Sequence, residues 1–94
     1  MGDERMTIQS LRYIVAVAEA GSITEAAKKL HISQPSLSAA VKEAEREVGF
    51  NIFTRSRSGI ALTKEGVEFL GYARHVIQEI RLLEDRFILN QPEK

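Results

Sequence analysis

The 94-residue chain contains no cysteine and no tryptophan, and its acidic and basic residues balance at 13 each. The absence of cysteine excludes disulfides, thiolate zinc sites and cysteine nucleophiles. No apolar run approaches the roughly 20 residues of a membrane-spanning helix, and the N-terminus lacks an apolar signal region. We therefore expect a cytoplasmic protein without membrane association. The zero net charge gives no support to nucleic-acid binding, for which basic domains are typical, so such a function depends on where the charges lie.

The sequence also lacks a catalytic or metal-binding pattern. The two histidines, His31 and His75, have no second histidine or companion acid at ligand spacing, so we interpret each as a surface or turn residue. No serine lies in a nucleophile-elbow context, and there is no glycine-rich phosphate loop. We therefore expect neither an enzyme nor a cofactor or metal site.

The first half of the chain has the pattern of short helices. Between residues 8 and 20, apolar side chains recur at intervals of three and four, as on one face of a helix. Gly21 ends this helix because glycine tolerates a positive φ. The sequence from Ser22 to Glu25 is a capping box that begins a second helix, which we expect to extend to Leu30.

A third helix is predicted from residue 33 to residue 48. Ser33 is a good N-cap, Gly49 is a good stop, and Pro35 is compatible with a first turn, where backbone N–H groups have no helical partner. Ser33, Pro35 and Ser36 are also common at the start of helices that bind no ligand. The motif alone is therefore compatible with simple capping as well as with ligand binding.

Residues 50–62 change to a strand-like pattern. Two short apolar runs, 52–54 and 60–62, predict a two-stranded hairpin around a polar turn at 55–59. From residue 50 to residue 64 there are three basic residues and no acid. Arg55 and Arg57 in the turn are either solvated charges or contacts to phosphate, and their place after two short helices favours phosphate.

A long helix is predicted from residue 63 to residue 89, capped by Thr63. Its apolar residues alternate at intervals of four and three, as in a coiled-coil heptad. At about 1.5 Å per residue it would be about 39 Å long and would project from so small a domain. The projecting part favours a homodimer, and the alternative is a helix packed along its own domain. The residues predicted at the dimer interface are Phe69, Ala73, Val76, Ile77, Ile80, Leu83 and Phe87.

Together these elements predict a mainly α protein. It is a winged helix-turn-helix of three helices and a two-stranded wing at residues 8–62, followed by a long dimerisation helix at residues 63–89. We expect a disordered N-terminal extension at residues 1–7 and the start of an interdomain linker at residues 90–94. In a helix-turn-helix, here the second and third predicted helices, the later helix of the two enters the major groove of DNA. That helix is the one at residues 33–48. The predicted DNA contacts are Ser22, Thr24, Ser33, Gln34, Pro35, Ser36, Ser38, Ala39, Lys42, Arg55, Arg57 and Lys64.

The first turns of the third helix suit close approach to a duplex. Apart from the core residue Leu37, we expect residues 34–40 to be exposed, and none is charged or large. Gln34 could bond adenine, and small apolar groups could meet a thymine methyl. The helix N-terminus attracts phosphate. Lys42 lies near a flanking phosphate, whereas the acids at positions 43, 45 and 47 lie toward the far end, away from the groove.

The sequence resembles the N-terminal domain of LysR-type transcriptional regulators. The resemblance rests on Ala-x-x-Gly-Ser followed by Ala-Ala, on Ser-Gln-Pro-x-x-Ser, on Phe-x-Arg and on Leu-Thr-x-x-Gly, and it extends from about residue 8 to residue 89. It implies that residues 33–36 and Ser38 contact the groove, that Arg55 and Arg57 contact DNA from the wing, and that the long helix dimerises.

The resemblance further implies a regulator that binds an inverted-repeat operator in double-stranded DNA as a homo-oligomer, often a tetramer. A small-molecule effector would act only through a C-terminal domain, which these 94 residues lack. Two residues depart from the family pattern. Ala40 replaces a long polar residue, which leaves the operator sequence open, and Ala44 replaces leucine, which thins the core at a cost of about 1–3 kcal/mol unless a neighbour fills the space.

Two alternative functions remain. A winged helix that has lost DNA binding and serves as a protein-interaction module would fit the neutral net charge, but acidic or bulky apolar residues would then be expected on the wing and the third helix. A small enzyme has no supporting pattern. We therefore favour a sequence-specific DNA-binding domain.

Overall fold

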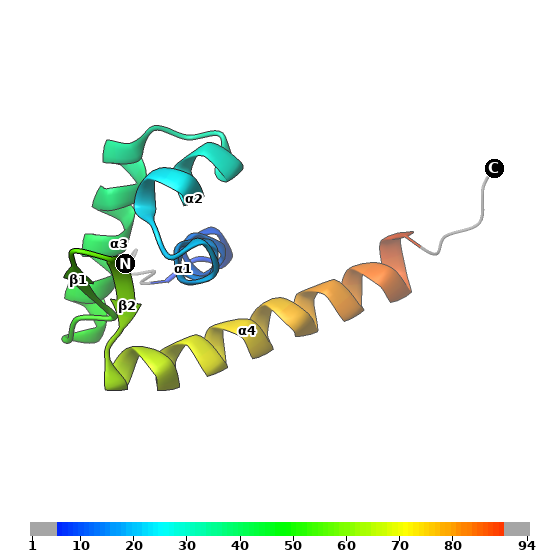
Figure 1. Ribbon diagram of the computed structural model, residues 1–94. Helices are drawn as coiled ribbons and strands as arrows, with labels where there is room; N and C mark the ends of the chain where they lie inside the picture. Colours follow the sequence, from blue (N-terminus) through cyan, green and yellow to red (C-terminus); the bar gives the residue numbers. More distant parts are fainter. Residues whose placement is uncertain (1–5, 90–94) are drawn as a thin grey trace.

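The computed structural model describes residues 6–89. Its elements, in chain order, are α1 (Ile8–Ala20), α2 (Ile23–Leu30), α3 (Gln34–Val48), β1 (Phe53–Ser56), β2 (Gly59–Leu62), α4 (Lys64–Glu84) and a π-helical turn η1 (Asp85–Leu89). The first three helices and the β1–β2 hairpin form one body, from which α4 projects (Figure 1). This is the winged helix-turn-helix with a long C-terminal helix that the sequence predicts. None of the helices in residues 6–89 is long and apolar enough to cross a membrane.

The beginning of the fold differs from the prediction. Residues 1–7 were expected to form a disordered extension, but Thr7 is the N-cap of α1, and its Oγ1 accepts a hydrogen bond from the Ser10 amide at 3.0 Å. Met6 is partly buried against the core. The prediction is therefore wrong for these two residues. The rest of the predicted extension, residues 1–5, and the predicted linker, residues 90–94, lie outside the described residues.

The turns that join the first three helices follow local capping rules. The Ser22 Oγ accepts from the Glu25 amide at 3.1 Å, as the capping box predicts, and the Glu25 carboxylate lies 3.5 Å from the Lys28 ammonium group. His31 ends α2 with φ +60°, and it is the one non-glycine residue with a positive φ in residues 6–89. This left-handed residue makes the turn into α3 short.

The core lies where α1, α2 and α3 meet the base of the hairpin. Ala26 and Ala27 are almost fully buried, so the helices approach closely at this point. The spacing predicts Leu37, Val41, Ala44 and Val48 as the apolar face of α3; the first three are buried, and Val48 is half-buried. In α1 the spacing predicts an apolar face of Leu11, Ile14, Val15 and Ala18, but of these only Ile14 is buried, the other three are half-buried, and Val17, which lies outside that face, is buried. The core cluster comprises Ile14, Val17, Ile23, Ala26, Ala27, Leu37, Val41, Ala44, Ile52, Phe53 and Leu70.

The hairpin is longer than its apolar residues suggest. β1 and β2 pair antiparallel from Phe53 opposite Leu62 to Ser56 opposite Gly59, which leaves a two-residue tip, Arg57 and Ser58. Such short connections match the twist of paired strands. The predicted five-residue turn is therefore wrong, and Arg55 lies within β1 rather than in the tip. Near its tip, one residue from the Ser56–Gly59 pair, the hairpin joins the α1–α2 turn through a bond from the Ile60 amide to the Gly21 carbonyl oxygen at 3.2 Å.

The start of α4 is held against the loop that precedes the hairpin. The Thr63 amide donates to the Ile52 carbonyl oxygen at 3.0 Å, and its hydroxyl donates to the Asn51 carbonyl oxygen at 2.6 Å while capping the Gly66 amide at 2.8 Å. A Cβ added to Gly66 would lie 2.1 Å from the Ile52 carbonyl oxygen. Only glycine therefore allows this contact between the helix and the loop.

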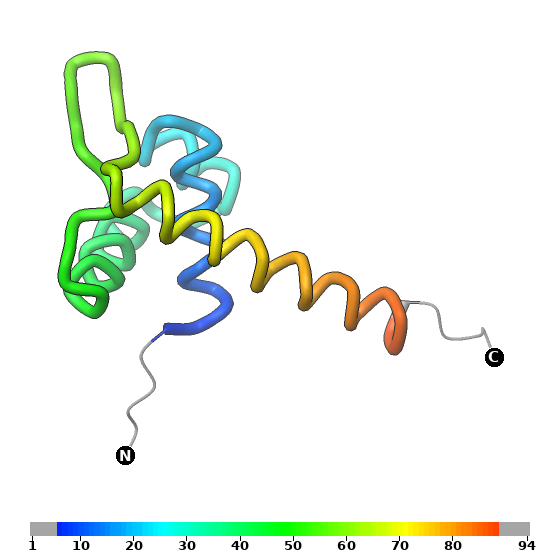
Figure 2. Tube along the Cα trace, turned by 90° about the horizontal axis from the view of Figure 1, so that it is seen from below, coloured from blue at the N-terminus to red at the C-terminus, as the bar shows by residue number. Residues whose placement is uncertain are grey.

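The long helix packs on α1 and then leaves the domain (Figure 2). Leu70, Ala73 and Ile77 are buried, and Arg74 pairs with Glu19 of α1 at 3.3 Å. Ala73 and Ile77, which were predicted at a dimer interface, therefore lie in the chain's own fold. An α-helix has 3.6 residues per turn, whereas a heptad repeat assumes 3.5. Along a straight helix, residues at heptad spacing therefore move progressively around its surface and do not all face the same neighbour.

The remaining predicted interface residues fall into two groups. Phe69 is half-buried, with its ring 6.5 Å from that of Phe50 in an edge-to-face arrangement, and Ile80 is also half-buried. Val76, Leu83 and Phe87 are exposed. The helix therefore packs along its own domain through Leu70, Ala73 and Ile77 and presents an apolar face to solvent further along, and the homodimer stays a prediction.

The close contact at Gly66 predicts opposite effects for two glycine substitutions in α4. Gly66→Ala should lower the free energy of unfolding by about 3 kcal/mol or more, since the added methyl group meets backbone rather than a movable side chain. Gly71→Ala is the control, because a Cβ there meets nothing within 4 Å. It should raise stability by about 0.5–1 kcal/mol through helix propensity. Urea unfolding followed by circular dichroism measures both, and equal effects would contradict this account of Gly66.

Candidate nucleic-acid interface

The N-terminus of α3 is organised by two serines. The Ser33 Oγ accepts from the Ser36 amide at 3.2 Å and donates to the Ser36 Oγ at 2.9 Å. Pro35 lies in the first turn between them. Both serines are exposed, and each hydroxyl oxygen retains a lone pair that could accept from a ligand. Capping and ligand contact are therefore compatible at these two residues.

The exposed surface of α3 is narrower than predicted. Gln34, Pro35 and Ala39 are exposed together with the two serines, but Ser38 and Ala40 are half-buried. These two residues flank the buried Leu37 and Val41 on the helix surface, so they lie at the edge of the packed face. The resulting surface is uncharged and has one long side chain, that of Gln34.

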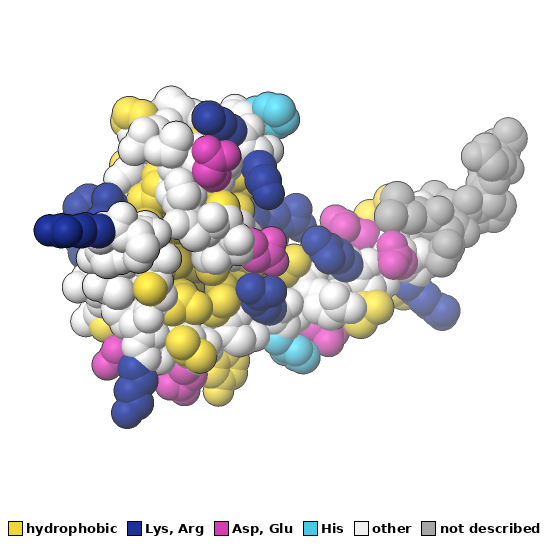
Figure 3. Space-filling model, in the orientation of Figure 1, with side chains coloured by type: hydrophobic (Ala, Val, Ile, Leu, Met, Phe, Trp, Pro, Cys, Tyr) yellow, Lys and Arg dark blue, Asp and Glu magenta, His cyan; other side chains and the backbone are white. Residues whose placement is uncertain are grey.

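Basic side chains lie beside this surface. Lys42 of α3 and Arg55 of β1 are exposed and line one hollow between the helix and the wing, together with Glu45 and Asn51. Arg57 is exposed at the tip of the wing. Figure 3 shows Lys and Arg side chains gathered on the side of the body where Figure 1 places the wing. The fold thus brings Lys42 beside Arg55, which follows it by 13 residues in the sequence.

The other predicted contacts lie on the neighbouring turns. Ser22 is half-buried, and its hydroxyl caps α2, whereas Thr24 is exposed in the first turn of that helix. Lys64 is exposed in the first turn of α4. Each of these residues is thus at a helix N-terminus, where free backbone N–H groups favour an anion.

Glu45 is a residue whose role the sequence analysis missed. The acid was expected to lie at the far end of α3, away from the site, but it lines the hollow beside Lys42 and Arg55. Its Oε2 accepts from the Ile52 amide at 2.8 Å and from the Phe53 amide at 3.1 Å. The sequence carries no local signal for these bonds, because they depend on how the loop after α3 folds back.

The described residues offer no metal site. In residues 6–89 no three His, Cys, Asp or Glu side chains come together as ligands, and no buried side-chain nitrogen or oxygen lacks a hydrogen-bond partner. The statement that His75 has no companion acid was wrong, since its Nε2 lies 3.8 Å from the Glu79 carboxylate one turn along α4. Both side chains are largely exposed, which is typical of a solvated surface pair.

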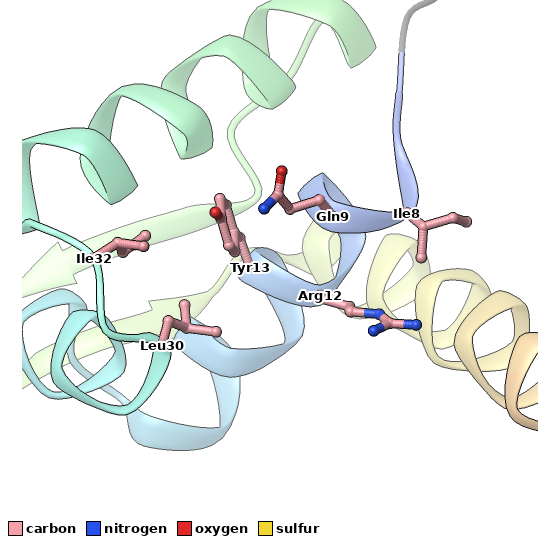
Figure 4. A pocket seen from close by; sticks show the side chains of 6 residues that line it. All are labelled: Ile8, Gln9, Arg12, Tyr13, Leu30 and Ile32. Atoms are coloured by element: carbon pink, nitrogen blue, oxygen red, sulfur yellow. The ribbon is translucent and has the colours of Figure 1, made fainter.

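A second hollow lies between the start of α1 and the end of α2 (Figure 4). Leu30, Ile32 and Tyr13 form one part of its wall, and the Arg12 side chain points away from them toward α4. The residues that line it are Ile8, Gln9, Arg12, Tyr13, Leu30 and Ile32. No Asp, Glu, His, Cys, Ser or Lys side chain lines it.

Short helices, a tight left-handed turn and a basic two-stranded wing define the class of winged helix-turn-helix proteins. A family model described as "Bacterial regulatory helix-turn-helix protein, lysR family" matches residues 8–67. The chain therefore belongs to the lysR family of bacterial regulators, as its sequence motifs indicate.

Curated relatives support this assignment. The transcriptional regulator TfdT of Cupriavidus pinatubonensis is 44% identical over 72 residues, which are 77% of this chain and 32% of the relative. The Hca operon transcriptional activator HcaR of Escherichia coli is 43% identical over 74 residues, 79% of this chain and 25% of the relative. The chain thus spans a third or less of the length of these proteins. They are transcriptional regulators rather than enzymes.

Solved structures share the fold. The structure of the CbnR DBD–DNA complex has a TM-score of 0.80 and 40% identity, with 86% of this chain and 93% of that chain covered. The structure of the BenM DBD with benA site 1 DNA has a TM-score of 0.82 and 36% identity, with 86% and 91% covered. Both neighbours are LysR-type DNA-binding domains in complex with DNA.

The cap of α3 predicts different costs for its two serines. Ser33→Ala should lower the free energy of unfolding by about 1 kcal/mol, because the Ser36 amide loses its acceptor. Ser36→Ala should cost less than about 0.5 kcal/mol, since this exposed side chain only accepts from Ser33. Thermal unfolding of the two variants measures the difference. A larger loss for Ser36→Ala would contradict the capping geometry.

Proposed function

We propose that this chain binds double-stranded DNA sequence-specifically, with α3 in the major groove and the wing near the minor groove. One observation carries the proposal. The exposed side chains at the start of α3 are uncharged and, apart from Gln34, small, and exposed cations border them at Lys42, Arg55 and Arg57. An uncharged helix end flanked by cations suits base edges with phosphates on either side. The neighbours CbnR and BenM, whose DNA-binding domains have been solved with DNA, support it.

Base contacts fall to the first two turns of α3. Gln34 has the length and the paired donor and acceptor to bond an adenine, and Pro35 and Ala39 offer apolar contact to thymine methyl groups. Ser33, Ser36 and Ser38 complete the proposed groove contacts. Of these three serines, Ser38 is half-buried, whereas the other two are exposed.

Phosphate contacts fall to the wing and the neighbouring helix starts. Lys42, Arg55 and Lys64 are the proposed phosphate partners, and Arg57 at the wing tip suits a narrow minor groove. Ser22 and Thr24 lie at the N-terminus of α2, whose free backbone N–H groups we propose as a further phosphate contact. The neutral net charge does not oppose this arrangement, because a DNA backbone responds to where the charges lie, and residues 50–64 contain three cations and no acid.

A homodimer through the long helix would extend recognition to a two-fold operator. The exposed apolar residues of its second half, Val76, Leu83 and Phe87 among them, favour a partner helix there. Phe69 and Ile80 border this face and are half-buried. We further propose that the chain acts within a longer cytoplasmic regulator, where an effector domain and tetramer formation would modulate operator binding.

The proposed function is tested by anisotropy of labelled duplexes, with a sequence selected by the wild-type chain compared with a scrambled one across a salt series. Pro35→Glu should weaken binding to the selected duplex roughly 100-fold, because a carboxylate in the groove meets the DNA charge. An acid in a first turn stabilises a helix, so folding should be preserved.

Gln78→Glu on exposed α4 is the matched control, since it adds the same charge far from α3, and it should bind as the wild type does. Equal binding of selected and scrambled duplexes by the wild-type chain would refute specific recognition. Unchanged binding by Pro35→Glu would refute the placement of α3 in the groove.

The proposed dimer predicts that Leu83→Asp reduces self-association. Leu83 is 56% exposed, so an aspartate there is tolerated in the monomer but would be desolvated against a partner helix. The dimer dissociation constant should rise at least about tenfold in sedimentation equilibrium, and Gln78→Glu again serves as the control. A wild-type chain that sediments as a monomer at high concentration would disprove the dimer.

A further inference from the structure

The wing is a small element whose position depends on its attachments. A two-stranded ribbon has little stability of its own in water. Besides its internal pairing, the hairpin is held at its base by the buried Phe53 and by the carboxylate of Glu45, and nearer its tip by the bond from the Ile60 amide to the Gly21 carbonyl oxygen. Of these attachments, only the carboxylate is a polar link to the proposed recognition helix.

The bonds made by Glu45 are specific in geometry. One carboxylate oxygen accepts from two successive amides, Ile52 at 2.8 Å and Phe53 at 3.1 Å, at the point where the chain enters β1. Both bonds are partly shielded from solvent, and the side chain of Glu45 is half-buried. Hydrogen bonds to an ionised acceptor are among the stronger ones in proteins.

The charge of Glu45 has the wrong sign for its location. It lines the same hollow as Lys42 and Arg55, the cations proposed to contact phosphate. A carboxylate there repels a DNA backbone, so a residue with no other role should bind DNA more tightly when the charge is removed. A residue that orients the wing should show the opposite effect. The sign of the affinity change therefore separates the two roles.

We propose that Glu45 is a positioning residue for DNA recognition, whose carboxylate fixes the wing relative to α3 so that both engage one duplex. The inference rests on the proposed function and adds to it a residue that touches no DNA. It also explains how an acid can occupy a hollow bordered by cations: its charge is directed at two backbone amides.

The first test compares three variants on the duplex selected by the wild-type chain. Glu47→Ala is the control, since it removes an equal charge from an exposed residue of the same helix, and it should bind as tightly as the wild type or slightly more tightly. Glu45→Ala should bind at least about tenfold more weakly than this control, because two amides lose their acceptor. Glu45→Gln keeps an oxygen acceptor and should bind within about threefold of the control.

The second test separates positioning from general loss of structure. If Glu45 orients the wing, Arg57→Ala should weaken binding in the wild-type background but have little further effect beside Glu45→Ala. Gln34→Ala, in the proposed groove, should cost the same in both backgrounds. Such a double-mutant cycle isolates the coupling between two residues. Amide exchange should accelerate at Ile52 and Phe53 in Glu45→Ala and slow again in Glu45→Gln.

The outcomes distinguish this inference from the function on which it rests. Tighter binding by Glu45→Ala, or additive effects with Arg57→Ala, would overturn the positioning role while leaving DNA recognition intact. A wild-type chain that prefers no selected duplex would overturn both. Weaker binding that is coupled to Arg57, rescued by glutamine and absent from Glu47→Ala would establish the positioning role.

Discussion

The segment from Asn51 to Phe53 is the point on which the rest of the structure depends. Its amides donate to Glu45 of α3, and its carbonyl oxygens accept from Thr63 at the start of α4. The side chains of Ile52 and Phe53 lie in the core. Gly66 allows α4 to begin against the Ile52 carbonyl oxygen, where any Cβ would collide. One short segment thus links the proposed recognition helix, the wing and the long helix.

Most of the fold could be predicted from the sequence because its signals are local. Ser22, Ser33 and Thr63 cap the helices that follow them, and Gly21 and Gly49 end helices with a positive φ. Such signals act over three or four residues, so spacing alone reveals them. The exposed residues at the start of α3 follow from the same local rules, which is why much of the candidate site was also predictable.

What the sequence did not reveal depends on contacts between distant segments. The role of Glu45 requires the loop after α3 to fold back over seven residues. The burial of Ala73 and Ile77 depends on the direction in which α4 leaves the wing and crosses α1. The predicted dimer interface includes these residues with Leu83 and Phe87, although the first pair faces the chain's own domain and the second pair faces solvent. Periodicity reveals an apolar face but not the partner that covers it.

The division of α4 into a packed half and an exposed half bears on the distance between the two recognition helices of the proposed dimer, and so on the spacing of the two DNA half-sites. The first half is fixed to the domain at Ile52 and along α1, including the pair between Arg74 and Glu19. In the proposed dimer, a partner that holds the second half therefore holds α3 as well, because the packed half of the helix lies between them. The distance between the two recognition helices is then set by the length of a helix, and half-site spacing follows from it. A recognition helix on a flexible tether would tolerate many spacings, whereas this arrangement favours one.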